Sequence, residues 1–199
     1  MKINSGFLKA ALLVTAFGCV SPNAFCGGMV TGTVDASMAK YKTGAVVYLK
    51  GVPGKIRPKT ALVEQKNIEF TPHVIAVPVG STVSFVNRDH VNHDIFSDDT
   101  TKPLDINNSE HGIFKKVVFD KPGAVNLRCT LHAEMSGYVV VVDSNHYAVT
   151  GADGTFSIRN VPPGRYEVAA WSERLKNTKI NTVTVKDDQT SSVVISLEK

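Results

Sequence analysis

Three residue types that bind soft metal ions lie within one seven-residue segment of the chain. The segment is "CTLHAEM", in which Cys129, His132 and Met135 follow the pattern Cys-x-x-His-x-x-Met. Thiolate, imidazole and thioether groups are the ligands that copper prefers. The same cysteine could also be half of a disulfide, a catalytic thiol or a packed core thiol. The cellular compartment and the rest of the sequence help to choose among these four interpretations.

The N-terminus predicts export from the cytoplasm. A lysine-bearing start and the short apolar run 10–20 are followed by small and polar residues, as in a secretory signal peptide over residues 1–26. We expect cleavage after Cys26; acylation at Cys19, as in a lipoprotein, is the weaker match because Phe17 is large. No later stretch has the length and apolarity of a membrane span. The sequence therefore predicts a soluble periplasmic or secreted protein.

Cleavage would leave Cys129 as the sole cysteine of the mature chain, because the other two lie in the signal peptide. A lone cysteine cannot form an internal disulfide in an oxidising compartment. A buried structural thiol is common, but the polar neighbours Arg128 and Thr130 disfavour it here. No oxyanion architecture or helix start accompanies the thiol, and no hydrolase motif is present, so we expect no enzymatic activity.

A second histidine-bearing segment supplies the rest of a copper site. It is "FVNRDHVNHDIFS" (85–97), which contains His90 and His93 after the alternating, strand-like run 81–87. The segment 120–142 similarly indicates a turn, a strand, a loop and a strand. Two histidines, a thiolate and a distant axial methionine are the ligands of blue copper sites. Loops at the ends of two strands could bring these groups to one ion.

Residues 60–142 resemble a cupredoxin of the plastocyanin and amicyanin kind, including periplasmic proteins labelled methylamine utilization proteins. The resemblance rests on Asn-x-Asp at a strand end, a following histidine, and Cys-x-x-His with a methionine before an apolar strand. It implies one copper ion, cycling between Cu(I) and Cu(II), with the ligands His93, Cys129, His132 and Met135. The family spacing favours His93 over His90. It also implies that His132 is the ligand nearest the surface.

The resemblance assigns supporting roles to two further residues. Asn87 is expected to tie the two ligand loops together through backbone hydrogen bonds. Asp94 replaces the asparagine that is usual after the first ligand; we expect it to be solvated or turn-bonding, although an inward carboxylate would lower the reduction potential. His73 and His111 are expected at the surface, and His146 in a linker.

The C-terminal segment 147–171 resembles a carboxypeptidase-regulatory-like, or transthyretin-like, β-sandwich through its Asp-Gly-x-Phe and Val-Pro-Pro-Gly-x-Tyr motifs. Such domains begin with strands like those at 31–37 and 43–51. We therefore expect an all-β protein in which residues 28–56 and 146–199 form one sandwich. A cupredoxin Greek-key sandwich (60–142) would be inserted in it; a tandem arrangement is the alternative.

The charge pattern bears on partners. The net charge of +4 falls to about +2 when the two lysines of the signal peptide are removed. Residues 27–60 carry six cations against Asp35 alone, and this charge could steer a redox partner. Nucleic acid is excluded as a ligand by the compartment and by the lack of a dense basic patch with stacking aromatics.

These observations predict a periplasmic type 1 copper protein that carries single electrons between redox partners, whose identities the sequence does not give. Two alternatives stay open. One is copper binding or delivery on a cupredoxin scaffold, and the other is a structural or assembly module with a copper site.

Overall fold

The structure is a computed structural model that describes residues 27–112, 114–177 and 179–199. The predicted signal peptide, with Cys19 and Cys26, lies outside these residues. The elements are β1 (Gly28–Ala36), η1 (Ala39–Lys42), β2 (Val46–Lys50), β3 (Thr60–Lys66), β4 (Glu69–Thr71), β5 (Val74–Pro78), β6 (Ser81–Asn87), β7 (His93–Ser97), β8 (Leu104–Ser109), β9 (Phe114–Phe119), β10 (Gly123–Arg128), β11 (Ser136–Val142), β12 (Tyr147–Val149), β13 (Thr155–Val161), β14 (Gly164–Trp171), β15 (Lys176–Asn177), β16 (Asn181–Val185) and β17 (Thr190–Glu198). The all-β fold class is confirmed.

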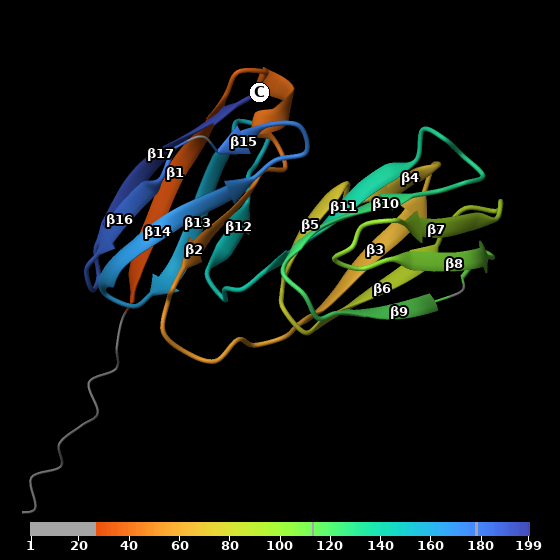
Figure 1. Cartoon of the computed structure of the whole chain (residues 1–199), viewed down its shortest axis with the longest axis horizontal. Coiled ribbons are helices and arrows are strands. Elements are labelled where there is room, and N and C mark those ends of the chain that lie inside the picture. The colour runs from red at the N-terminus through yellow and green to blue at the C-terminus, as the bar shows by residue number, and fades with distance from the viewer. Residues whose placement is uncertain (1–26, 113, 178) are drawn as a thin grey trace, which may run out of the picture.

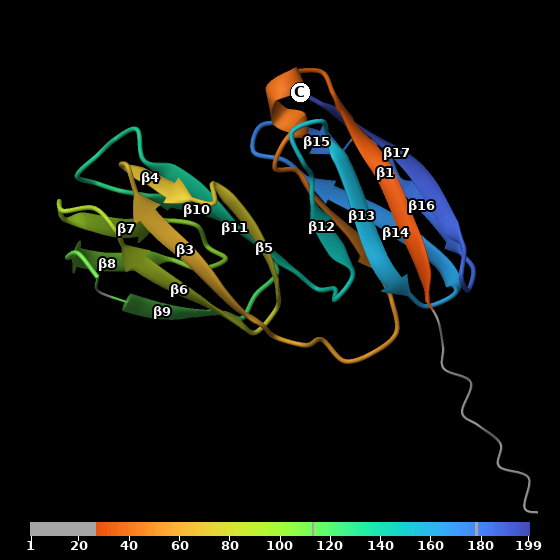
Figure 2. The same cartoon turned by 180° about the vertical axis from the view of Figure 1, so that it is seen from behind.

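Four sheets stack in pairs, and Figures 1 and 2 show the two resulting β-sandwiches side by side. One sandwich consists of the sheets β13-β1-β17-β15 and β12-β2-β14-β16. The other consists of β5-β11-β10-β7-β8 and β4-β3-β6-β9. We call the first the terminal sandwich, because its strands come from residues 28–50 and 147–198, and the second the middle sandwich, from residues 60–142.

Strand pairing joins the two ends of the described chain. β1 runs parallel to β17 and antiparallel to β13, while β2 pairs antiparallel with β12 and β14. The two sheets of the terminal sandwich share a core that includes Val30, Leu49, Phe156, Val168 and Ile195. The chain leaves this sandwich after β2, builds the middle sandwich and returns at β12. That the middle sandwich is a domain inserted in the terminal one, rather than one of a tandem pair, stays a prediction.

The Val-Pro-Pro-Gly-x-Tyr motif forms the turn between β13 and β14. The Tyr166 hydroxyl lies 3.0 Å from the carbonyl oxygen of Pro162 and 3.2 Å from that of Pro163, and can donate to both. A Cβ atom at Gly164 would lie 2.6 Å from the Tyr166 hydroxyl oxygen, so the tyrosine requires glycine at this position. The motif thus closes the end of the terminal sandwich through a tyrosine packed against its own turn.

The middle sandwich holds a second core, and this core fixes the strand ends that carry the predicted ligands. Phe85, Phe119, Val125 and Val139 are fully buried in it. Burial of such side chains stabilises each by about 1.5–3 kcal/mol relative to exposure. β7, β10 and β11 lie in one sheet, in which β10 is between the other two.

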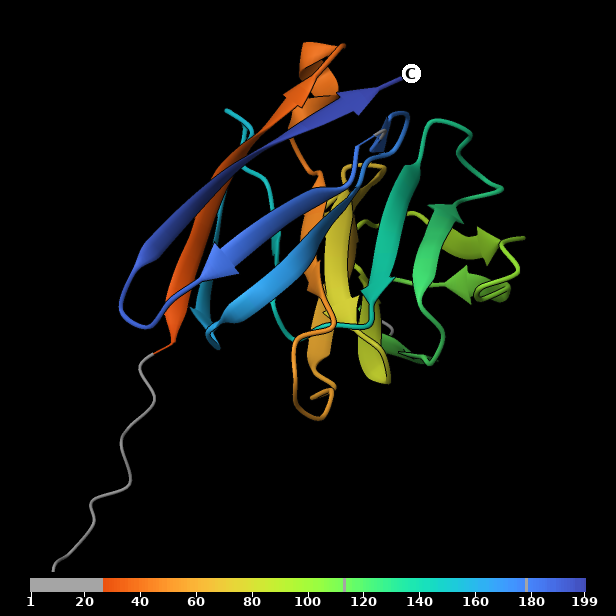
Figure 3. The same ribbon diagram turned by 60° about the vertical axis from the view of Figure 1, so that its left-hand side comes forward.

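An apolar interface connects the sandwiches, as the turned view in Figure 3 helps to follow. Val46 of β2 is buried together with Val140 and Val142 of β11. The rings of Tyr138 and Trp171 meet across the interface with centroids 5.1 Å apart. Within the described residues, no helix has the length and apolarity needed to cross a membrane.

Candidate metal centre

Neighbouring strands bring the two predicted ligand segments to one end of the middle sandwich. β7 begins at His93, and β10 pairs with β7 through Arg128 and Phe96. The next residue after β10 is Cys129, and the loop 129–135 then returns to β11. Two backbone hydrogen bonds fold this loop: Cys129 N to Met135 O, at 3.3 Å, and Met135 N to His132 O, at 3.0 Å.

Three predicted ligand atoms converge at this end. The ligand atoms of His93, Cys129 and His132 all lie within 4.8 Å of one another. The two Nδ1 atoms of the histidines are 3.2 Å apart, and Cys129 Sγ is 3.7 Å from His132 Nδ1. Metal–nitrogen and metal–sulfur bonds of about 2.0 and 2.3 Å at tetrahedral or trigonal angles separate ligand atoms by roughly 3.3–3.8 Å. The donor types and these two separations therefore fit one metal ion.

Met135, the predicted thioether ligand, is in the same loop as Cys129 and His132. Its side chain is 1% exposed, and it belongs to the same buried cluster as Cys129. The loop hydrogen bonds place its backbone against Cys129 and His132. Its role as the axial ligand stays a prediction.

A carboxylate sets the orientation and the tautomer of His93. His93 is 0% exposed, and its Nε2 lies 2.9 Å from Asp89 Oδ2. Because an ionised carboxylate only accepts, Nε2 donates and the Nδ1 lone pair faces the cluster. Ligand histidines in metalloproteins usually have such a partner. This role of Asp89 was not predicted, although the residue lies only four positions before His93.

Asp89 is itself fixed by a tight turn between β3 and β4. Its carboxylate accepts hydrogen bonds from the backbone N–H groups of Asn67, at 2.7 Å, and Ile68, at 3.0 Å. Both turn residues have positive φ, 57° and 61°. Partial burial raises the pKa of Asp89, but hydrogen bonds from Ile68, His93 and Asn67 outweigh this effect and hold the pKa below its usual value.

The expected role of Asn87 is wrong. Its Nδ2 donates to the carbonyl oxygens of Val91, at 2.7 Å, and Ser109, at 2.6 Å, and its Oδ1 accepts from Asp89 N at 2.8 Å. These bonds fasten the loop before His93 to β8. They do not reach the loop 129–135, so Asn87 does not tie the two ligand segments together.

Asp94 forms the tie instead. Of the two roles expected for it, solvated or turn-bonding, the solvated one is wrong. Asp94 is 5% exposed, and it accepts hydrogen bonds from Thr130 N, at 2.7 Å, and from the Thr130 hydroxyl. Burial raises the pKa of Asp94, but the two bonds from Thr130 lead the contributions that bring it below its usual value. Sequence reasoning could not single out Thr130, because its partner is 36 positions away.

The burial of Cys129 is compatible with a role as a metal ligand. Within the described chain Cys129 is the free cysteine, it is buried, and burial raises the pKa of its thiol. A bound cation deprotonates such a thiol, since the thiolate is the ligand. His132 is partly exposed, whereas His93, Cys129 and Met135 are buried.

The other histidines lie outside this cluster. His90 and His111 are exposed and stack with centroids 4.9 Å apart. His73 is also exposed, and it bridges Ser136 O, at 3.0 Å, to Glu173 Oε2, at 3.2 Å, across the interface. His146 lies between β11 and β12.

Comparison with protein families matches residues 128–198 to the carboxypeptidase regulatory-like domain. This confirms the predicted resemblance of the C-terminal segment, although the match begins before residue 146. The matched segment includes β11 of the middle sandwich as well as β12 to β17. No curated protein matches the chain.

Solved structures similar to this chain include copper proteins. A Cu-containing nitrite reductase from Thermus scotoductus SA-01 is 29% identical over 45% of this chain and 24% of its own, with a TM-score of 0.40. The chain thus matches about a quarter of that enzyme. A purple cupredoxin from Nitrosopumilus maritimus is 26% identical over 41% of this chain and 99% of its own, with a TM-score of 0.38. An amicyanin variant in its reduced Cu(I) form is 19% identical over 48% and 98%, with a TM-score of 0.40.

Proposed function

We propose that this protein is a type 1 copper protein that carries single electrons in the bacterial periplasm. The convergence of His93, Cys129 and His132 within 4.8 Å supports the proposal most directly. Two imidazole nitrogens and one thiolate are ligands for copper, and Met135 would be the long axial ligand. Copper bound there would supply a site that gains and loses one electron.

The surroundings of the ligands favour electron transfer because they limit movement. His93 is held by Asp89, and the two ligand segments are joined by Asp94 and Thr130. Fixed ligands keep a similar geometry in both oxidation states, so little reorganisation is needed when the electron moves. This rigidity suits a carrier better than a protein that must release its metal.

Two exposed apolar side chains are close in sequence to the predicted histidine ligands. Leu131, next to His132, is 56% exposed, and Val91, two residues before His93, is 48% exposed. Exposed apolar groups beside a site favour brief contact with another protein. A redox partner would therefore approach from the side of His132.

Cyclic voltammetry of the copper-loaded mature protein tests this function. We expect a reversible one-electron wave that persists over repeated cycles and is absent in Cys129→Ser. Loss of copper during the reductive half of the cycle would contradict the carrier and favour copper delivery.

The compartment needs its own test. The proposal assigns residues 1–26 to a cleaved signal peptide. Expression of the full chain in a Gram-negative bacterium should give a periplasmic protein whose N-terminus is Gly27. A cytoplasmic protein that retains Met1 would contradict this assignment.

A further inference from the structure

A basic groove lies where the chain passes between the two sandwiches. It has a volume of about 430 Å³, and its lining includes Lys55, Arg57 and Lys59 from the β2–β3 connection and Arg159 from β13. Asn145 and His146, from the β11–β12 connection, and Asn160 of β13 complete the polar lining. No carboxylate is among the described residues that line it.

The cations of this groove differ from the other basic residues of the same region. Lys50 forms an ion pair with Glu167 at 2.7 Å. In the described part of the chain, Lys55, Arg57 and Arg159 form no ion pair with a carboxylate within 4.0 Å. Several like charges around one concave surface create a positive potential that attracts anions.

The groove is built on a fixed backbone. Asn145 Oδ1 accepts from Arg57 N at 2.8 Å, and Asn145 Nδ2 donates to Lys55 O at 2.9 Å. The neighbouring His146 carbonyl accepts from Leu49 N at 3.0 Å. These bonds hold both connections in place while using none of the cationic side-chain groups. The side-chain charges of Lys55, Arg57 and Arg159 therefore remain available to a ligand. Lys59 Nζ instead lies 3.5 Å from the Tyr147 hydroxyl and over the ring of that tyrosine.

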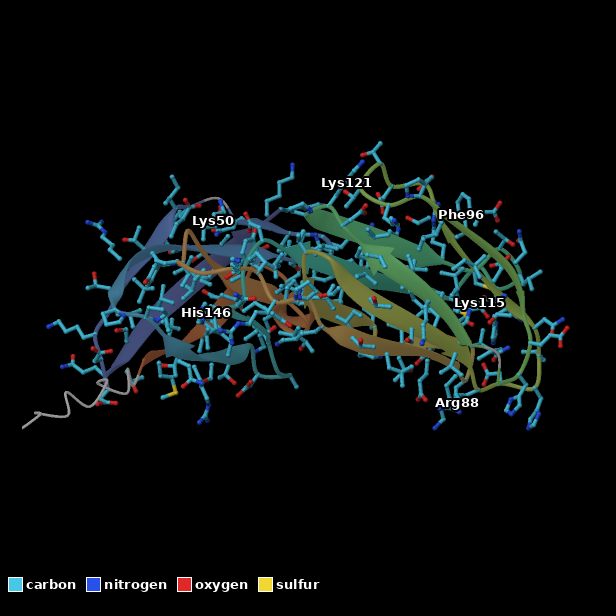
Figure 4. All side chains as sticks on the ribbon, turned by 90° about the horizontal axis from the view of Figure 1, so that it is seen from below. Lys50, Arg88, Phe96, Lys115, Lys121 and His146 are labelled. Carbon is cyan, nitrogen blue, oxygen red and sulfur yellow. The ribbon has the colours of Figure 1, made fainter. Side chains whose placement is uncertain are left out.

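The groove is separate from the metal centre. Figure 4 shows His146 in one half of the molecule, and Arg88 and Phe96 in the other half. Phe96 belongs to β7, the strand that begins at the predicted ligand His93, and Arg88 immediately follows β6. Copper chemistry therefore does not account for the groove.

We propose that this groove binds the phosphate group of a small phosphorylated ligand. Arginine presents a planar fork of donors that matches phosphate oxygens, and lysine adds a point charge. The volume falls in the range of about 300–1,000 Å³ that is usual for small-molecule sites. The same phosphate chemistry could come from a dissolved molecule or from a lipid headgroup, and the experiment distinguishes these sources.

The first part of the experiment is calorimetric titration of the mature protein with pyrophosphate at low ionic strength. We expect saturable binding that weakens about tenfold or more in the groove variant Lys55→Gln/Arg159→Gln, because two charged contacts are lost. The control variant Lys66→Gln/Lys121→Gln removes the same charge from exposed lysines outside the groove lining and should bind like the wild type. A far-ultraviolet circular dichroism spectrum and a thermal unfolding midpoint like those of the wild type verify that both sandwiches of each variant are folded.

The second part is co-sedimentation with vesicles of phosphatidic acid in phosphatidylcholine, against phosphatidylcholine alone. Pyrophosphate binding lost only in the groove variant would support the site with a dissolved ligand. Vesicle binding alone, lost only in the groove variant, would support it with a lipid phosphate. Binding of neither probe, or equal loss in the control variant, would overturn the proposal.

Discussion

Asp94 joins the two ligand segments by accepting hydrogen bonds from the backbone N–H and the hydroxyl of Thr130. Each of these residues directly follows a predicted ligand, since Asp94 follows His93 and Thr130 follows Cys129. The relative position of the imidazole and the thiol therefore depends on one buried carboxylate. The same contact explains why an acidic residue is tolerated next to a predicted copper ligand, because the hydrogen bonds from Thr130 stabilise the negative charge of Asp94.

Replacement of Asp94 by alanine should destabilise the protein and weaken copper binding. The change removes both hydrogen bonds from Thr130 to the buried Asp94 carboxylate, and a bond to a charged group contributes about 1.5–3 kcal/mol. Urea unfolding of the metal-free protein measures this loss. Asp98→Ala is the control, because it removes an exposed ion pair with Arg128 that contributes about 0–1 kcal/mol. Equal stability of the Asp94 variant and the wild type would contradict the assigned role.

Replacement of Asp89 by asparagine should act on metal affinity. The amide nitrogen of the introduced side chain can face His93 Nε2 as a donor, which favours the tautomer whose Nδ1 carries a proton. We expect copper affinity to fall about 10- to 100-fold, as for other partners of metal-bound histidines. Competition with a copper chelator measures it, and Asp120→Asn at an exposed carboxylate serves as the control. An unchanged affinity would show that Asp89 does not orient His93.

The interface between the sandwiches can be tested at Trp171. Truncation to alanine removes the ring contact with Tyr138 and opens the apolar layer around Val140 and Val142. If the middle sandwich is an inserted domain that folds independently, calorimetry should resolve two thermal transitions more clearly in Trp171→Ala than in the wild type. Copper should raise only the transition of the middle sandwich. A single transition that copper shifts as a whole would indicate one cooperative unit.

His146 should make stability depend on pH. Burial lowers its pKa, so the unfolded chain binds the proton more readily than the folded chain. Its contribution to stability is present above the unfolded pKa of about 6.5 and is lost as the pH falls below that value. Between pH 7.5 and 5.5, the free energy of unfolding should fall more for the wild type than for His146→Gln. Parallel curves for the two proteins would contradict this account.

The sequence predicted the fold class and the convergence of three ligands because both depend on local patterns. Alternating strands give an all-β chain, and the Cys-x-x-His spacing places Cys129 and His132 in one loop. That β7 lies beside β10 is a contact between distant segments, and the structure alone gives it. The C-terminal motif was equally readable, because Tyr166 bonds to prolines only three and four positions away.

The supporting contacts could not be predicted in the same way because they join distant segments. Asp94 bonds to Thr130, 36 positions away, and Asp89 bonds to Asn67, 22 positions away, so both contacts depend on how the sheets pack. The basic groove was only partly predictable for the same reason, because its lining residues come from distant segments. The run of lysines before residue 60 was visible, but Arg159 joins it from β13 and Lys50 is neutralised by Glu167.

The visible absorption spectrum of the mature protein loaded with Cu(II) tests the central claim most directly, with the electron paramagnetic resonance spectrum recorded on the same sample. Convergence of His93, Cys129 and His132 on one ion predicts an intense thiolate-to-copper band at long wavelength and a narrow copper hyperfine splitting. Cys129→Ser should remain folded and lose the band. A colourless wild-type protein, or the weak spectrum of ordinary tetragonal copper, would contradict a type 1 site.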